Sequence, residues 1–330
     1  MFDERWPVEA EELAEALEAV LAKYCRPDIL RAIDVEDRAA VTGEHLEQLD
    51  QALRQFGLWE LPADPYLLTR ATISLGFYLA PVPFASAAST QLVLRENGIA
   101  NGIDRSVVPA GLPRVAVSFD GGIGICATPD RVRRSAAGES VVLVESCVGD
   151  ITPVEGDVDA LRAWGFLLES ARLVGAAQSL IRYCVGYVSD RRQFGVPVGS
   201  FQGVAHPLAE AATAVAAADL LTRHAVYLAD CDGALPMSAA VMAAAKSRAA
   251  SRQAAATVHQ ALGGYGFTIE SDCQLYSRRI RAWTAAMPDP GPWLAELART
   301  LADPDARESV TDLWQFDRGF TLPRWAGENR

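Results

Sequence analysis

Three short motifs punctuate the second half of the chain: Arg191-Arg192-Gln193-Phe194-Gly195, Phe201-Gln202, and Gln260-Ala261-Leu262-Gly263-Gly264-Tyr265-Gly266-Phe267. The first two stand between apolar helical stretches, where Pro197 and Gly199 break the helical pattern. The third ends an alanine-rich helical stretch at Gly263 and Gly264, a common way for helices to stop. Arginine binds phosphate through its planar guanidinium group, and glycine lets backbone N–H groups approach a ligand closely. Together these residues predict a diphosphate-binding site.

The order and separation of these motifs resemble the C-terminal domain of the acyl-CoA dehydrogenase family, which carries R-x-x-F-G, F-Q and Q-x-L-G-G-x-G-F. The resemblance covers residues 159–287 well and the N-terminal third moderately. It implies a mainly α-helical fold, with an N-terminal helical domain, a central β-segment and a C-terminal four-helix bundle. It also implies FAD as the cofactor, an acyl-CoA substrate and a flavoprotein as electron acceptor.

The resemblance also implies which residues hold the cofactor. The positions expected to face the ADP half of FAD, across a subunit interface, are Arg191, Gln193, Phe194, Gln202, Gln260, Gly263 and Gly264. Gln193 replaces a small polar residue of the family, and its amide can still hydrogen-bond a phosphate. Gln202 has an alternative interpretation as a helix-cap residue.

The spacing of apolar residues predicts where the domains lie. Helical spacing recurs in four stretches, at residues 8–25, around 46–56, 65–79 and 85–96. These stretches predict a helical domain over residues 1–110. Alternation begins at Arg114 and continues past a turn at Asp120-Gly121-Gly122, which predicts a β-domain over residues 111–155.

The remaining residues, 156–330, are expected to form the bundle and a tail. A long helix is predicted over residues 159–190 because apolar residues recur there with alternating steps of four and three. Its first half is expected to be buried on nearly all sides. Two further helices are predicted over residues 207–231, with Pro207 in the first turn, and over residues 238–261.

The chain departs from the family in two respects that concern catalysis. The predicted β-domain is short and lacks the T-E-x-x-x-G-S-D-type segment that holds the flavin ring in the family. Family members also use a glutamate to remove the α-proton of the acyl group. The two positions from which they supply it fall here on Gly165 and on Ala286-Met287. Glu169, one turn beyond Gly165, is a candidate for a displaced base, and an i,i+3 pair with Arg172 is the alternative.

Two hypotheses follow from these departures. The first is that the chain resembles the short subunit of heteromeric acyl-CoA dehydrogenases, such as those acting on steroid side-chain CoA thioesters. A larger homologous subunit would then carry the catalytic glutamate and the segment for the flavin ring. The alternative is a non-catalytic structural or regulatory homologue that does not bind FAD.

The composition of the 330 residues limits the classes of partner. A net charge of −12 argues against nucleic acid, although the arginines at 191–192 and at 278, 279 and 281 could each serve a phosphorylated small ligand. Neither a membrane segment nor a signal peptide is expected, because no apolar run has the length of a bilayer span. The six cysteines form no C-x-x-C pattern, so no metal site is predicted, and reduced thiols favour a cytoplasmic location.

Overall fold

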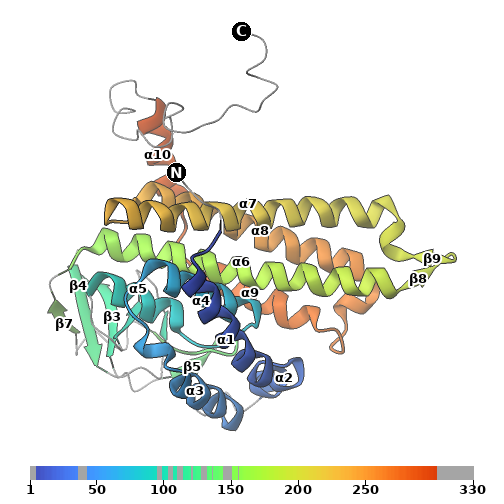
Figure 1. Ribbon diagram of the computed structural model, residues 1–330, viewed down its shortest axis with the longest axis horizontal. Coiled ribbons are helices and arrows are strands. Elements are labelled where there is room, and N and C mark those ends of the chain that lie inside the picture. The colour runs from blue at the N-terminus through green and yellow to red at the C-terminus, as the bar shows by residue number, and fades with distance from the viewer. Residues whose placement is uncertain are drawn as a thin grey trace.

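The computed structural model describes residues 5–35, 43–94, 99–102, 107–109, 114–119, 122–127, 132–135, 137–143, 151–154 and 156–302. Most of these residues are helical, and the longest helices form a bundle that runs the length of the molecule (Figure 1). Shorter N-terminal helices lie along one side of the bundle, and strands lie near one end of it. The predicted mainly helical fold is confirmed.

The N-terminal part of the chain forms a group of helices. They are α1 (Val8–Tyr24), α2 (Pro27–Val35), α3 (Glu44–Phe56), α4 (Pro65–Phe77) and α5 (Phe84–Leu94). The stops follow local chemistry: Gly57 ends α3 in the left-handed conformation, and the Asp64 side chain caps α4 by accepting from the Leu67 N–H at 2.9 Å. Helix α2 was not predicted, because so short a stretch with two buried apolar residues gives little periodic signal.

The strands form two small sheets beside the helices. One contains β1 (Ile99–Gly102), β3 (Arg114–Phe119), β4 (Gly122–Ala127) and β7 (Ile151–Val154), in the order β1-β3-β4-β7. The other has the order β2-β6-β5, from β2 (Val107–Pro109), β6 (Ser140–Leu143) and β5 (Val132–Arg134). Strands β3 and β4 pair antiparallel as the alternation predicts, while the turn at 120–121 lies outside the described residues. Strands β1 and β2 precede residue 111, so the sheets begin earlier in the chain than the sequence pattern indicates.

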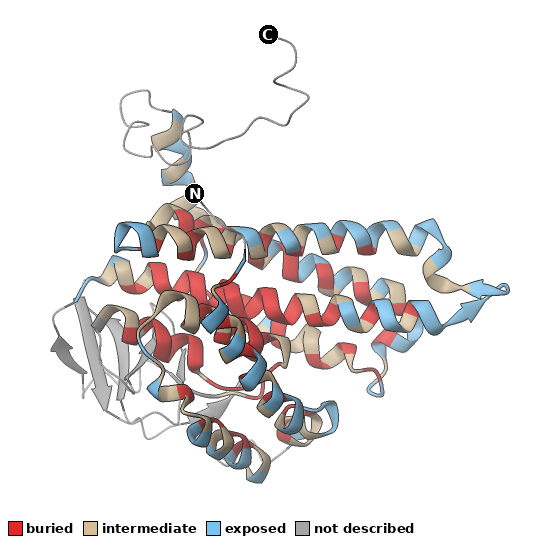
Figure 2. Cartoon of the chain, viewed as in Figure 1, coloured by how far each residue is buried: buried red, intermediate tan, exposed pale blue. Residues whose placement is uncertain are grey.

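The bundle consists of α6 (Val158–Asp190), α7 (Gln202–Asp232), α8 (Met237–Leu262) and α9 (Cys273–Ala286), followed by α10 (Gly291–Ala302). The Asp157 side chain caps α6 by accepting from the N–H groups of Asp159 and Ala160. As predicted, the first half of α6 is buried on nearly all sides (Figure 2). Helix α7 starts at Gln202, earlier than predicted. Pro207 therefore lies in its second turn, and the helix tolerates it there at the loss of one backbone hydrogen bond.

Helix α7 also bears on the expectation that no segment spans a membrane. Among the described helices it alone is long and apolar enough to cross a bilayer, with 28% of its most apolar window buried. Its apolar character comes mainly from alanine. Core helices of water-soluble proteins meet the same criterion, so one such helix is weak evidence for a membrane segment.

Two glycines allow α4 and α6 to cross with their backbones in contact. A Cβ atom on Gly175 of α6 would lie 2.0 Å from the carbonyl oxygen of Ile73. A Cβ atom on Gly76 of α4 would lie 2.1 Å from the carbonyl oxygen of Arg172. Real Cβ atoms do not approach backbone so closely, so each helix requires glycine at its contact point. This crossing joins the N-terminal helices to the bundle.

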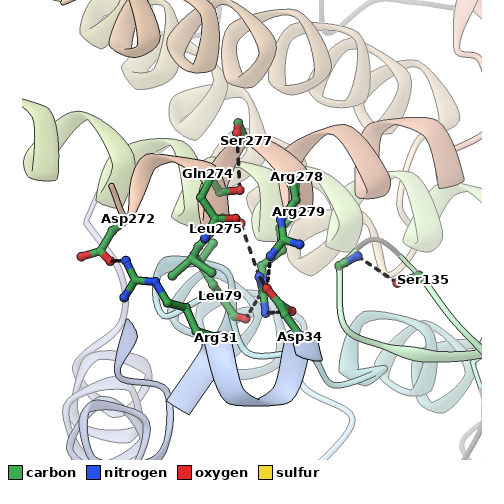
Figure 3. A network of polar contacts seen from close by, with 11 residues as sticks. Arg31, Asp34, Leu79, Ser135, Asp272, Gln274, Leu275, Ser277, Arg278 and Arg279 are labelled. Carbon is green, nitrogen blue, oxygen red and sulfur yellow. Dashed lines mark hydrogen bonds and ion pairs between the residues drawn. The ribbon is translucent and has the colours of Figure 1, made fainter. Parts of the chain in front are cut away.

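Buried charges make a second connection between the same two regions, through α2 and α9 (Figure 3). The fully buried guanidinium group of Arg279 donates to both carboxylate oxygens of Asp34, at 3.0 and 3.2 Å, and to the carbonyl oxygen of Leu79 at 3.2 Å. Arg278 also pairs with Asp34. Arg31 of α2 pairs with Asp272 at 2.5 Å. The interface between α2 and α9 is therefore held largely by ion pairs.

The glycine crossing can be tested with a matched pair of substitutions in α6. Gly175→Ala places a methyl group against the backbone of α4, so we expect a loss of at least about 1–3 kcal/mol in the free energy of unfolding. Gly186→Ala serves as the control because nothing lies within 4 Å of its Cβ position. At position 186, alanine should raise the free energy of unfolding by up to about 1 kcal/mol, because alanine favours the helix more than glycine does. Denaturant unfolding followed by circular dichroism measures both, and equal effects would contradict the assigned contact.

Candidate functional site

The R-x-x-F-G motif forms a tight β-hairpin that projects from one end of the bundle (Figure 1). Strand β8 (Arg192–Gln193) pairs with β9 (Val196–Pro197), and the turn residues Phe194 and Gly195 have φ angles of 53° and 83°. Two positive φ angles are typical of a type I′ turn, whose twist matches the flanking strands. Phe194 is an unusual residue at its position, because a bulky side chain disfavours positive φ.

The side chains of this hairpin point outward. Arg191, Gln193 and Phe194 are all exposed, and the Phe194 ring is 93% exposed, with only an edge contact to Phe201 at 6.1 Å between centroids. The Gln193 amide donates to the carbonyl oxygen of Arg192 at 2.8 Å. Among the residues that the structure describes, Arg191 forms no ion pair, so the exposed hairpin presents a guanidinium group, an amide and an aromatic face.

The second predicted segment ends α8 at the same end of the bundle. Gly263 has φ 59° and ψ −142°, a conformation open almost only to glycine, and the one-turn helix η4 (Gly263–Phe267) follows it. Gly263 and Gly264 are exposed, and nothing lies within 4 Å of their Cβ positions. Gln260 is exposed on the last turn of α8. The turn therefore offers bare backbone and an amide side chain to a ligand.

Helices α7 and α8 enclose a shallow hollow beside these residues. It has a volume of about 320 Å³ and is lined by Gly203, Val204, Pro207, Ala256, Thr257, Gln260 and Ala261. Gln202 is exposed at the first position of α7, and the N-cap position belongs to Phe201, which makes no side-chain cap. The arrangement of α7 thus gives no support to Gln202 as the capping residue.

Glu169 lies elsewhere, deep in the bundle, and is paired. Its Oε2 accepts from Nε and Nη2 of Arg172, at 3.0 and 2.5 Å, and its side chain is 2% exposed. The same guanidinium group donates to Glu139 at 2.5 Å and lies over the ring of Trp283 at 4.4 Å. Burial lowers the pKa of Arg172, but the charges of Glu139 and Glu169 outweigh it and raise that pKa. The i,i+3 pair predicted as the alternative is thus present.

The two positions at which the family places its base carry no carboxylate here. Gly165 is buried, as are its sequence neighbours Trp164 and Phe166, while at the second position Ala286 is exposed and Met287 is buried. Phe166 makes an edge-to-face contact with Trp293 of α10, at 5.3 Å between centroids. Neither position could therefore present a carboxylate to a substrate.

The second arginine cluster does not serve a ligand in the way the sequence suggested. Arg278 and Arg279 pair with Asp34, from a helix that is distant in sequence, and only Arg281 is exposed. Sequence patterns cannot reveal such a partner, because nothing local links α2 to α9.

Tyr187 is a residue near the hairpin that the sequence analysis missed. Its place four residues before Arg191 puts it on the last turn of α6.

The cysteines and histidines give no sign of a metal site in the part of the chain that the structure describes. His259 stacks on Phe267 at 4.9 Å, as expected of a packing contact at a helix end. Burial raises the pKa of Cys25 to about 12, of Cys184 to about 11 and of Cys273 to about 12, so these thiols remain protonated at neutral pH.

Comparison with known proteins places this site in a family. A family model described as "Acyl-CoA dehydrogenase, C-terminal domain" matches residues 167–286, which include the hairpin and the glycine turn. Acyl-CoA dehydrogenase IpdE2 of Mycobacterium tuberculosis is 28% identical over 317 residues, which cover 86% of this chain and 94% of the relative. Acyl-CoA dehydrogenase FadE34 of the same organism is 30% identical over 256 residues, or 66% of this chain and 35% of the relative.

Solved structures show the same fold at lower sequence identity. A variant of the Tcur3481-Tcur3483 steroid ACAD superposes with a TM-score of 0.76 at 18% identity, covering 90% of this chain and 99% of the other. The ChsE4-ChsE5 complex from Mycobacterium tuberculosis gives a TM-score of 0.71 at 16% identity, covering 92% and 99%. The motifs, the family model, the relatives and the fold agree, and residues 167–286 of the chain form an acyl-CoA dehydrogenase C-terminal domain.

Proposed function

We propose that this chain is one subunit of a flavin-dependent acyl-CoA dehydrogenase and binds the ADP half of FAD. The observation that carries the proposal is the pairing of an exposed Arg191 hairpin with an exposed Gly263-Gly264 turn at one end of the bundle. In this proposal a larger homologous subunit supplies the catalytic glutamate. The complete enzyme introduces an α,β double bond into an acyl-CoA, with FAD accepting the β-hydrogen as hydride when bound.

The residues present fit the ADP half of FAD. Arg191 would donate charge-assisted hydrogen bonds to the diphosphate, which are stronger than neutral ones. The amides of Gln193 and Gln260 would add neutral hydrogen bonds. The Gly263-Gly264 turn has open space where side chains would stand, so its backbone can approach a phosphate. Phe194 and Gln202, both exposed, would line the same site from the hairpin and from the start of α7.

The assignment of the base to a partner rests on the interior of the bundle. Glu169 is already paired with Arg172, and the two positions where the family keeps its glutamate hold Gly165 and Ala286-Met287, which have no carboxylate. We therefore assign Glu169 a structural role in this chain. A general base must reach the proton that it removes, which the fixed Glu169 carboxylate could do only by giving up its partner.

A partner subunit is also consistent with α7, an alanine-rich helix that is only partly buried, because small apolar side chains allow helices of two subunits to approach closely. By analogy with the steroid ACAD named above, a steroid side-chain CoA thioester is the proposed substrate class. Electrons would leave for an acceptor flavoprotein. The proposed location is the cytoplasm, where free thiols such as Cys231 stay reduced.

The first test compares the chain alone with the chain co-expressed with a longer homologue that carries both the catalytic glutamate and the flavin-ring segment. We expect no acyl-CoA dehydrogenation by the purified chain, because it lacks both the base and the flavin-ring segment. The complex should show flavin absorbance and turnover. Turnover by the chain alone would contradict the proposal, and a stable complex without flavin would favour the non-catalytic homologue.

A substitution in the hairpin tests the cofactor role directly. Arg191→Ala removes one charge-assisted contact to the diphosphate, worth about 1.5–3 kcal/mol, so FAD affinity of the complex should fall by about one to two orders of magnitude. Arg182→Ala is the control, because Arg182 is exposed on the same helix away from the hairpin. Titration with FAD followed by flavin fluorescence measures both affinities. Equal flavin affinity in the two variants would reject the assignment of Arg191.

Glu169→Gln separates a structural carboxylate from a catalytic one. Because Arg172 loses one of its two charged partners, unfolding should become easier by about 1.5–3 kcal/mol. Turnover of the folded complex should stay within a few-fold of wild type, whereas loss of a true base costs about 10²- to 10⁴-fold. Asp159→Asn, which breaks an exposed pair with Arg162, is the control and should cost about 0–1 kcal/mol. Abolished turnover in a folded Glu169→Gln complex would make Glu169 the base.

A further inference from the structure

Two tyrosine rings connect the hairpin end of α6 to the glycine turn after α8. The ring of Tyr187 on α6 stacks on that of Tyr265 in η4, with 5.2 Å between centroids and 11° between planes. Tyr187 is part of the last turn of α6, and Tyr265 stands between Gly264 and Gly266. The stack therefore joins two segments that lie far apart in the sequence.

On the α6 side, Tyr187 is coupled to the hairpin through the backbone. The Arg191 N–H donates to the carbonyl oxygen of Tyr187 at 2.9 Å. The Val198 N–H then donates to the carbonyl oxygen of Arg191 at 2.7 Å and closes the base of the hairpin. A displacement of Tyr187 would therefore displace the start of the hairpin with it.

On the other side, Tyr265 belongs to the glycine turn itself. Gly263 and Gly264 have open space at their Cβ positions, so no side chain of their own holds them. Gly266 is buried, and a Cβ atom there would lie 2.9 Å from Cβ of Leu262. The carbonyl oxygen of Tyr265 accepts from both N and Oγ of Thr268 at 3.0 Å. Tyr265 is thus the large side chain through which the glycines are held against α6.

A second pair of stacked tyrosines lies one turn earlier along α6. Tyr183, one turn before Tyr187, stacks on Tyr276 of α9 at 6.1 Å, and its hydroxyl lies 3.3 Å from Oγ of Ser271. Burial raises the pKa of Tyr183 to about 12. Its hydroxyl therefore stays protonated at neutral pH and can continue to donate. The contacts of Tyr183 thus hold the turn of α6 that precedes the Tyr187–Tyr265 stack.

From this geometry we propose that Tyr187 and Tyr265 are positioning residues, whose stacked rings set the spacing between the Arg191 hairpin and the Gly263-Gly264 turn. This inference rests on the proposed function, because that spacing matters if the two segments bind one ADP moiety. The proposal requires the two rings to stack on each other. It does not require their hydroxyl groups to contact the cofactor.

The experiment compares leucine with phenylalanine at both positions. Tyr187→Leu and Tyr265→Leu remove the stack, so the Kd of the complex for FAD should rise about tenfold. Tyr187→Phe and Tyr265→Phe keep the rings and should restore wild-type affinity. Amide hydrogen exchange of residues 259–268 in the chain alone should become faster in the leucine variants and stay unchanged in the phenylalanine variants.

Tyr66→Leu is the matched control, because it removes a partly buried ring that contacts Trp6 at 6.3 Å, away from both segments. It should lower the melting temperature and change neither FAD affinity nor exchange at 259–268. Unchanged FAD affinity in the leucine variants overturns the inference, as does equal loss in the phenylalanine variants. If the wild-type complex binds no FAD, the proposed function fails and the cofactor role of the stack fails with it. The exchange measurement still decides whether the stack holds the turn.

Discussion

The backbone contact between α4 and α6 is the constraint on which the rest of the structure depends. Gly76 and Gly175 bring the two helices so close that their relative position has almost no freedom. Helix α6 is then enclosed on the remaining sides by the bundle, and its first half is buried. Its far end is exposed at Ser189 and Asp190, so the chain direction at Asp190 fixes where the exposed hairpin begins. A contact deep in the core thus determines where the residues proposed to face the ligand lie.

The charges of this protein divide by depth into two groups. Inside, Arg279 pairs with Asp34, and Arg172 pairs with Glu139 and Glu169. The Arg279–Asp34 and Arg172–Glu139 pairs link segments that are far apart in the chain, whereas Glu169 lies one turn from Arg172 on α6. A buried charge without a partner is costly, so these groups are committed to one another. At the hairpin, Arg191 and Gln193 stay exposed. The division explains why Arg191 could bind a phosphate while the fully buried Arg279 could not.

Local signals in the sequence predicted the features that depend on local chemistry. The end of α6 at Asp190, the glycine stop at Gly263 and the β3–β4 pairing each follow from neighbouring residues, and the structure confirms them. The features that were missed depend on contacts between distant segments. Asp34 and Arg279 are 245 residues apart, and no periodicity connects them. The Tyr187–Tyr265 stack was missed for the same reason, since each ring alone resembles ordinary packing near a helix end.

Phe194 shows why the hairpin is better explained by function than by stability. Its positive φ is unfavourable for a bulky residue, and strain of this kind costs about 1–3 kcal/mol. Its ring is also 93% exposed, so burial within this chain does not offset the strain. A glycine or asparagine would form the same type I′ turn with less strain. Contact of the Phe194 ring with a bound ligand or a second subunit would bury the ring and offset this strain. The proposed site, in which the ADP half of FAD lies between two subunits, supplies such a surface.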